Sequence, residues 1–390
     1  MKILVLGAGM YVTGRGGTGS GTVLSSIAET SKKLPIEDVL VLARSEGNRA
    51  VVNDSVSRIN HCLGTTLRVR YSQIEDESSI NAVLAKDRFD CAMVVLPDHL
   101  HYPYAKILLE NGVHCIVVKP LTSKRSEAID LVDVQKRNNL LGVVEFHKRY
   151  DETNLFVKKR IQERQLGKLL YFSVDFSQRV TIPLEVFRGW VERTNVFQYL
   201  GVHYVDLIYF LTGFRPVRLT ATGTKGLLIS EGIDNYDSIH ATILWEDPDN
   251  HRDGFVSLIS TNWIDPRCTS AMSDQKYKVV GTKGRIECDQ KNRGIELVQE
   301  GAGVRHINPY FSEYLPSPDG RTEFSGYGHR SISLFLNDCD RIRKGEISTS
   351  LLDEVRPTFR QALVSTLVLD AANASMARNS EWIRIDDSTE

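Results

Sequence analysis

The chain has 390 residues, of which 42% are hydrophobic and 25% charged, and its formal net charge is -1. That length exceeds one ordinary hydrophobic core and favours two domains. A pI of about 6.8 lacks the basic excess of a nucleic-acid-binding surface, and no apolar run approaches the roughly 20 residues that cross a bilayer. We therefore expect neither a nucleic-acid partner nor a membrane segment.

The first part of the chain alternates apolar runs with helical patterns. Continuous apolar strands separated by helices are typical of a parallel sheet buried on both faces. We predict an α/β Rossmann domain with a doubly wound parallel sheet over residues 1–146. Its strands are expected at Ile3–Leu6, Val39–Leu42, Met93–Leu96, Cys115–Val118 and Leu141–Val144.

The rhythm changes after residue 146. Leu170, Phe172, Val174 and Phe176 alternate with polar or less apolar neighbours, and residues 239–245 alternate likewise. Period-two patterning indicates strands with one buried face, as in an antiparallel sheet. We predict an α+β domain with a large, mainly antiparallel sheet over residues 147–390, closed by an apolar helix near residues 363–374.

A glycine turn follows the first expected strand and precedes an expected helix. This context suits a dinucleotide fingerprint, because glycines let the backbone approach a pyrophosphate at a helix N-terminus. The fingerprint is imperfect, since Val12 stands where a third glycine is usual, and the loop is extended to Gly21. The residues expected to bind the cofactor here are Gly7, Gly9, Met10, Tyr11 and Val12.

The second expected strand ends without the acidic residue that commonly binds the ribose of NAD. Arg44 and Ser45 stand there instead. A guanidinium can pair with a 2'-phosphate through two parallel hydrogen bonds. We therefore predict a preference for NADP over NAD. The alternative is that Arg44 is solvated, Glu46 contacts the ribose and NAD is the cofactor.

Two further strand ends carry polar residues. The run at 93–96 leads into Pro97-Asp98-His99-Leu100-His101, and the run at 115–118 delivers Lys119-Pro120. Ligands bind at the carboxyl ends of strands in open parallel sheets. We expect the two histidines to shape the nicotinamide end of the site rather than transfer protons. The cofactor-binding residues predicted from these strand ends are Leu96, Pro97, His99, His101 and Lys119.

These motifs occur in a recognisable order, followed by Gly201-Val202-His203. Together they resemble the Gfo/Idh/MocA oxidoreductases, the glucose–fructose oxidoreductase and inositol dehydrogenase family. The resemblance implies a dehydrogenase or reductase that transfers hydride between NAD(P) and a hydroxyl or carbonyl of a sugar, cyclitol or sugar derivative. It also implies a second domain that binds substrate and builds a homodimer or homotetramer.

Two departures from that family bear on the chemistry. The family usually has Glu-Lys-Pro, and this chain has Val118-Lys119-Pro120. The family usually has aspartate four residues before the histidine that matches His203, and this chain has Tyr199. Both supporting carboxylates are thus expected to be missing.

The residues expected to carry catalysis are Lys119, His203 and Tyr199. Burial lowers the pKa of an ammonium, which suits Lys119 to donate a proton to the reacting oxygen. His203 is the natural general base, since the unperturbed pKa of imidazole is near 6.5. Tyr199, one helical turn earlier, would orient the substrate or assist proton transfer. The alternatives are a structural His203 and a Tyr199 that only packs among other aromatics.

Lys148 and Arg149 follow the fifth expected strand. With Lys119, Tyr199 and His203 they form the predicted substrate-binding set, because guanidinium and ammonium groups bind carboxylate or phosphate. The alternative is a solvated basic hinge. The lost carboxylates also leave a second function open, that of a catalytically silent nucleotide-binding sensor.

The six cysteines show no CxxC spacing. Cys91 and Cys115 lie in or beside apolar runs, which indicates buried free thiols. We expect a cytoplasmic protein without a metal site.

Overall fold

The computed structural model describes residues 1–14 and 21–385. Within these residues the chain forms two compact units. Unit 1 comprises Met1–Thr122, Ser126–Tyr150 and Tyr310–Leu363, and unit 2 comprises Ser123–Arg125, Asp151–Pro309 and the chain from Val364 onward. The division at residue 146 stays a prediction, but the sequence patterns did not indicate that residues 310–363 return to unit 1.

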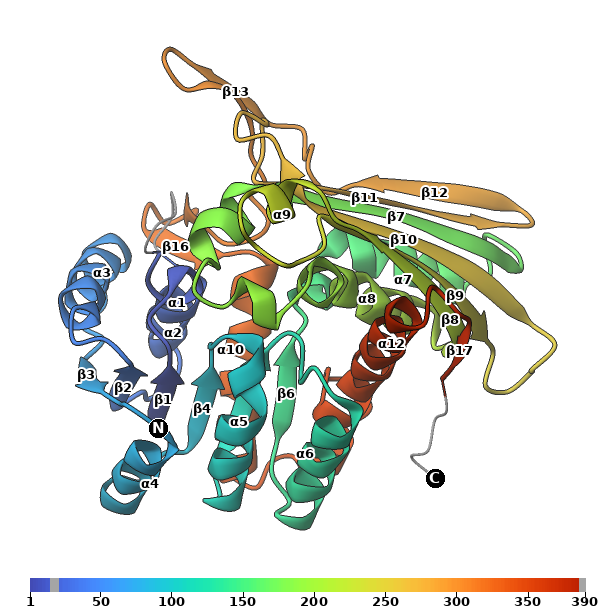
Figure 1. Cartoon of the computed structure of the whole chain (residues 1–390). Helices are drawn as coiled ribbons and strands as arrows, with labels where there is room; N and C mark the ends of the chain where they lie inside the picture. The colour runs from blue at the N-terminus through green and yellow to red at the C-terminus, as the bar shows by residue number, and fades with distance from the viewer. Residues whose placement is uncertain (15–20, 386–390) are drawn as a thin grey trace. The chain divides into compact units, whose positions relative to one another are not determined.

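Unit 1 contains a parallel sheet of six described strands in the order β3-β2-β1-β4-β5-β6 (Figure 1). The predicted α/β Rossmann domain is confirmed. Its elements are β1 (Lys2–Leu6), α1 (Met10–Thr13), α2 (Thr22–Ser31), β2 (Asp38–Ala43), α3 (Asn48–Leu63), β3 (Val69–Gln73), α4 (Glu77–Lys86), β4 (Cys91–Val94), η1 (Asp98–Leu100), α5 (His101–Glu110), β5 (His114–Val118), α6 (Arg125–Arg137), β6 (Gly142–Glu145), η2 (His147–Tyr150), β15 (Glu313–Pro316), β16 (Thr322–Ser325), α10 (Tyr327–Arg343) and α11 (Thr349–Leu352).

Helix α10 completes the cover of this sheet. The core on one side of the sheet joins side chains of α2 and α3 with Phe335 and Leu336 of α10, and it includes Met93, Ile116 and Val143 from β4, β5 and β6. The returning chain also lies along the edge of β6, where Val144 N donates to Pro357 O at 2.8 Å. The return therefore buries apolar strand surface and covers a sheet edge that would otherwise be open.

Unit 2 contains a sheet of seven described strands in the order β12-β11-β7-β10-β9-β8-β17. Only the β7–β10 pair in it is parallel, which confirms the predicted α+β class. The elements are α7 (Glu152–Gln162), β7 (Leu169–Arg179), η3 (Ile182–Val186), η4 (Val191–Arg193), η5 (Phe197–Gly201), α8 (Val202–Thr212), β8 (Arg215–Thr224), α9 (Leu227–Ser230), β9 (Ser238–Glu246), β10 (Gly254–Asp265), β11 (Ser273–Gly281), β12 (Gly284–Asp289), β13 (Glu296–Gln299), β14 (Gly303–His306) and β17 (Ile383–Arg384), while α12 (Phe359–Ala377) begins in unit 1 and ends in unit 2.

The alternating pattern of β7 and β9 sets the buried face of this sheet. Phe172, Val174 and Phe176 are buried as expected, and so are the alternate residues of β9, but Leu170 is 49% exposed. Leu170 lies at the start of β7, where alternation alone does not decide burial. The expectation for that residue was wrong.

A buried ion pair lies at the start of α7 in unit 2. Arg293 pairs with Asp151, and both side chains are almost fully enclosed. Asp151 also accepts the backbone N–H of Thr153 at 3.1 Å, which caps the helix, and Arg293 donates to the Thr153 hydroxyl at 2.8 Å. The pair thus ties the segment after β12 to the first turn of α7.

Cys91 and Cys115 are buried free thiols, as predicted. Among the helices of residues 1–14 and 21–385, none has the length and apolar character needed to cross a membrane.

Candidate cofactor and catalytic site

The strand order changes direction between β1 and β4, and the site expected at this point starts with the glycine turn. Gly7 has φ of +108°, and an added Cβ would lie 2.1 Å from Val95 O. Gly9 is the N-cap of α1, and an added Cβ there would meet no atom of the described residues within 4 Å. Gly7 is therefore required by the fold, whereas Gly9 faces open space in which a ligand could approach the backbone.

Replacing Gly7 with alanine is expected to lower the free energy of unfolding by about 1–3 kcal/mol, because of strain at positive φ and overlap with Val95 O. Gly9→Ala is the matched control. It should unfold at the wild-type urea concentration yet bind nucleotide more weakly. Equal stability of the Gly7→Ala protein and the wild type would contradict this account of the turn.

The helix after the glycine turn is interrupted. α1 ends at Thr13, with Gly14 in the left-handed conformation, and α2 starts after Gly21. The expected helix after the extended loop is α2, whereas the short α1 inside the loop region was not expected. Tyr11 and Val12 lie in α1, with Val12 fully buried, while the glycines between positions 15 and 20 lie outside the described residues.

Arg44 and Ser45 stand exposed just beyond β2. Their backbone oxygens accept hydrogen bonds from Gln73 Nε2 at 3.0 Å and from the Tyr71 hydroxyl at 2.5 Å. These bonds fix the loop and leave both side chains at the surface. Glu46 is paired with Arg49, an ion pair that lowers the pKa of the Glu46 carboxyl. That pairing disfavours Glu46 as the ribose ligand.

Lys119 directly follows β5 and is partly buried. Desolvation lowers the pKa of its ammonium to about 8, against the opposing pull of two carboxylates, Asp98 and Glu145. Both carboxylates are themselves buried. The family's motif carboxylate is absent at Val118, as expected, but these two other carboxylates act on Lys119.

Glu145 ends β6, the strand next to β5, and its negative charge acts on Lys119. It pairs in register with Val118, the residue that stands where the family has glutamate. Glu145 Oε2 and His147 Nδ1 are hydrogen bonded at 2.8 Å. The His147 ring lies 5.0 Å from Phe311 and 5.6 Å from Tyr327. The sequence analysis missed Glu145, since only the strand register places it next to the end of β5.

His101 is fully buried rather than lining an open site. Its Nδ1 lies 2.7 Å from Pro120 O and its Nε2 2.9 Å from Leu96 O. The ring thus joins the loop after β4 to the loop after β5. This arrangement gives His101 a structural role at the site, and direct contact with a cofactor stays a prediction. Three neighbours remain partly accessible: Leu96, Pro97 and His99.

Lys148 and Arg149 lie in η2 and are each only 3% exposed. Arg149 Nη1 donates to Gln361 Oε1 at 2.5 Å. The alternative of a solvated basic hinge is therefore wrong. Their role in substrate binding stays a prediction.

The other two predicted catalytic residues belong to unit 2. His203 lies in the first turn of α8 and is buried, with its ring 6.3 Å from Phe176. Tyr199 lies in the π-helical turn η5, and its ring packs edge-on against Phe187 at 4.7 Å and lies 6.3 Å from Trp263. These contacts support the packing role that was left open for Tyr199.

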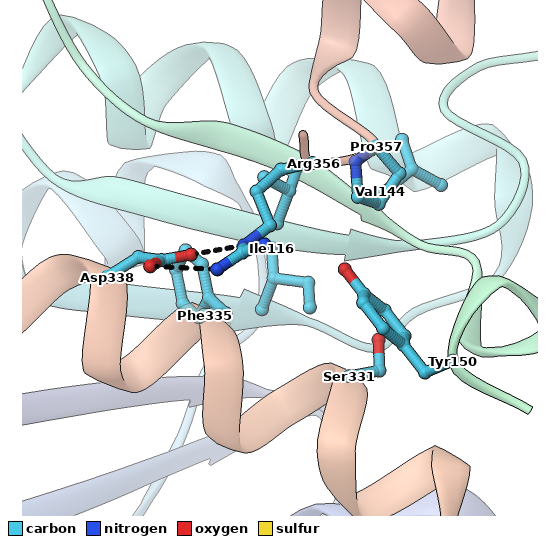
Figure 2. Close-up of a pocket in the computed structure, with 9 residues that line it drawn as sticks. Ile116, Val144, Tyr150, Ser331, Phe335, Asp338, Arg356 and Pro357 are labelled. Atoms are coloured by element: carbon cyan, nitrogen blue, oxygen red, sulfur yellow. Dashed lines mark hydrogen bonds and ion pairs between the residues drawn. The ribbon is translucent and has the colours of Figure 1, made fainter. Parts of the chain in front are cut away.

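A small cavity in unit 1 lies between β5, β6 and α10 (Figure 2). It measures about 10 Å³ and is lined by Ile116, Val144, Tyr150 and Phe335, with the Arg356–Asp338 ion pair closing one side. That is room for about one water molecule and excludes a sugar. Burial raises the pKa of the Tyr150 hydroxyl to about 12. The cavity therefore belongs to the interior packing.

Comparison with known proteins decides the family. Residues 21–146 match the model of an oxidoreductase family with an NAD-binding Rossmann fold, and residues 155–287 match the GFO/IDH/MocA C-terminal domain. The chain belongs to the Gfo/Idh/MocA oxidoreductase family. The matched range begins after the glycine turn, so the evidence for Gly7 and Gly9 is structural.

Three relatives illustrate the likeness. A scyllo-inositol 2-dehydrogenase (NAD(+)) from Bacillus subtilis is 23% identical over 233 residues, 58% of this chain and 64% of that protein. An inositol 2-dehydrogenase from Rhizobium meliloti is 21% identical over 308 residues, 78% of this chain and 83% of that protein. The structure of scyllo-inositol dehydrogenase from Lactobacillus casei with bound NAD(H) and scyllo-inositol has a TM-score of 0.66 at 15% identity and 99% coverage of both chains.

The residues of unit 1 fit a dinucleotide of this kind. The backbone is open at Gly9, Arg44 and Ser45 are free at the surface beyond β2, and Lys119 follows β5. All lie at the carboxyl edge of the parallel sheet, where such folds bind ligands. Among residues 1–14 and 21–385, no group of three potential ligands is arranged to hold a metal ion.

Proposed function

We propose that the protein is an NADP-preferring dehydrogenase or reductase acting on a hydroxyl or carbonyl of a sugar, cyclitol or sugar derivative. The observation that carries the proposal is Lys119, a partly buried lysine at a strand end with a pKa near 8. A group that exchanges protons near neutral pH at a ligand-binding edge suits alcohol and carbonyl chemistry. The inositol dehydrogenases among the relatives support the class of substrate.

The bound nicotinamide would supply the hydride chemistry, and the protein would handle the proton. In reduction, the Lys119 ammonium donates a proton to the carbonyl oxygen as hydride arrives at its carbon. In oxidation the same path runs in reverse, so that the hydroxyl proton passes to neutral Lys119 and from there to His203, the general base. Tyr199 orients the substrate, and the buried cations Lys148 and Arg149 hold any acidic group it carries.

The preference for NADP rests on Arg44 and Ser45 and departs from the NAD named for two of the relatives. Arg44→Ala is expected to weaken NADPH binding about 10- to 100-fold, the value of a hydrogen bond to a charged group, and to leave NADH binding nearly unchanged. Fluorescence titration of each cofactor checks this, with the exposed Arg58→Ala as control. A tenfold preference of the wild type for NADH would refute it.

The proposal as a whole is tested by turnover on a panel of sugars, cyclitols and keto-sugars with both cofactors. Turnover that disappears in His203→Ala while cofactor still binds would support alcohol chemistry. Tight cofactor binding without turnover on any substrate would favour the silent sensor. Light scattering of the same samples tests the proposed homodimer or homotetramer.

A further inference from the structure

We propose that Glu145, oriented by His147, is the carboxylate partner of Lys119 in this chain and holds the Lys119 ammonium ready for the reaction. The inference rests on the proposed function and deepens it. It assigns a positioning role to two residues outside the motifs by which the family is recognised.

The first observation is the strand register. Val118 is uncharged and cannot form an ion pair with Lys119, the residue that follows it. Glu145 is its direct partner on β6 and brings a carboxylate to the same end of the sheet. The charge that the motif lacks in sequence is thus present in space, contributed by the adjacent strand.

The second observation is how Glu145 is held. Its side chain is 3% exposed, and one oxygen interacts with His147 at 2.8 Å. The imidazole in turn packs against the rings of Phe311 and Tyr327, which also contact each other. A carboxylate locked by a packed imidazole loses little further freedom when it pairs with an ammonium, which suits a positioning residue.

The third observation is the buried hydroxyl next to Glu145. Glu145 Oε1 and the hydroxyl of Tyr11, in α1, are both buried. The pKa of Tyr11 is raised well above the usual value by burial and by the charge of Glu145 and a hydrogen bond to it. A phenol that stays protonated can donate to the carboxylate, which supports Glu145 in its charged form.

The charged and titratable groups around Lys119 set the expected pH behaviour. A carboxylate nearby favours the ammonium, so its removal must lower the pKa of Lys119 below about 8. Asp98 would remain and limit the fall. The groups that face this cluster are Asp98 from η1, Glu145 from β6, His147 from η2, Tyr11 from α1 and Tyr327 from α10.

The test is Glu145→Gln. We expect the proton affinity of Lys119 to fall about tenfold. It is read without substrate or cofactor, from the NMR titration of ¹³C-methylated lysines, with the Lys119 signal assigned by its loss in Lys119→Met. The exposed Glu110→Gln removes the same charge elsewhere and should leave that titration unchanged.

Two further variants distinguish the loss of the carboxylate from a folding defect. Val118→Glu added to Glu145→Gln restores a carboxylate beside Lys119 in the family's own position, and it should raise the affinity again. His147→Phe keeps a ring packed against Phe311 and Tyr327, and it should lower the proton affinity of Lys119 by less than Glu145→Gln does. An unchanged Lys119 titration in folded Glu145→Gln would overturn the inference. Absence of turnover on the panel would refute the proposed function and leave the titration result standing.

Discussion

Lys119→Met is expected to lower kcat for carbonyl reduction by about 10²- to 10⁴-fold, the usual worth of a positioned general acid. The substitution keeps most of the side-chain volume and removes only the amine. Nicotinamide binding, measured by fluorescence, should persist. The exposed Lys136→Met on α6 serves as the control, and both proteins should show the wild-type far-UV spectrum.

The rate of carbonyl reduction by the wild type should also depend on pH through the protonation of Lys119. Reduction needs the ammonium form, so its rate should be constant below about pH 8 and fall as pH rises through the pKa of Lys119. This limb should be absent from the residual rate of Lys119→Met. Retention of more than a tenth of the turnover by that variant would remove Lys119 from the chemistry.

Arg293→Met is expected to lower the free energy of unfolding by about 3–5 kcal/mol, because it leaves the Asp151 carboxylate buried without its partner. Asp151 and Arg293 are 2% and 7% exposed at their side chains, so solvent cannot replace the lost pairing. The change is measured by urea unfolding, followed by the fluorescence of Trp245 and Trp263, which are both buried in unit 2.

The double variant Asp151→Asn, Arg293→Met separates the pair from the general cost of substitution. It should recover most of the loss, since no uncompensated charge remains and asparagine can still cap α7. The exposed Arg285–Glu287 pair is the control, and Arg285→Met should change stability by less than about 0.5 kcal/mol. A cost for Arg293→Met as small as that of the control would contradict the account.

The sequence was sufficient to predict those elements and site residues that a local pattern marks. Five of the strands in unit 1 are apolar runs, and Lys119 and Arg44 are placed by following a run to its end. β3 was missed because Val69–Gln73 is an edge strand with a mostly polar sequence. The helix α1 was missed because its four residues stand within a glycine-rich stretch and are too few to show a helical pattern.

The rest depends on contacts between distant residues. Glu145 could be linked to Lys119 only through the pairing of β5 with β6, and no motif spans the 25 residues between them. The sequence predicted that His101 lines the site. Its burial could not be foreseen, because its two carbonyl partners, Leu96 and Pro120, come from different loops. The hydrogen bond of Arg149 likewise depends on a residue far along the chain, Gln361.

The return of residues 310–363 to unit 1 bears on how the protein is made. A ribosome releases all six strands of the parallel sheet before it has synthesised α10. Until then the apolar side chains of β4, β5 and β6 that pack on Phe335 and Leu336 have no cover on that face. The nascent nucleotide-binding domain thus exposes an apolar, aggregation-prone surface while the more than 150 residues between β6 and α10 are translated. We therefore expect the domain to complete its folding only after α10 has been translated, or with the help of a chaperone that covers this face.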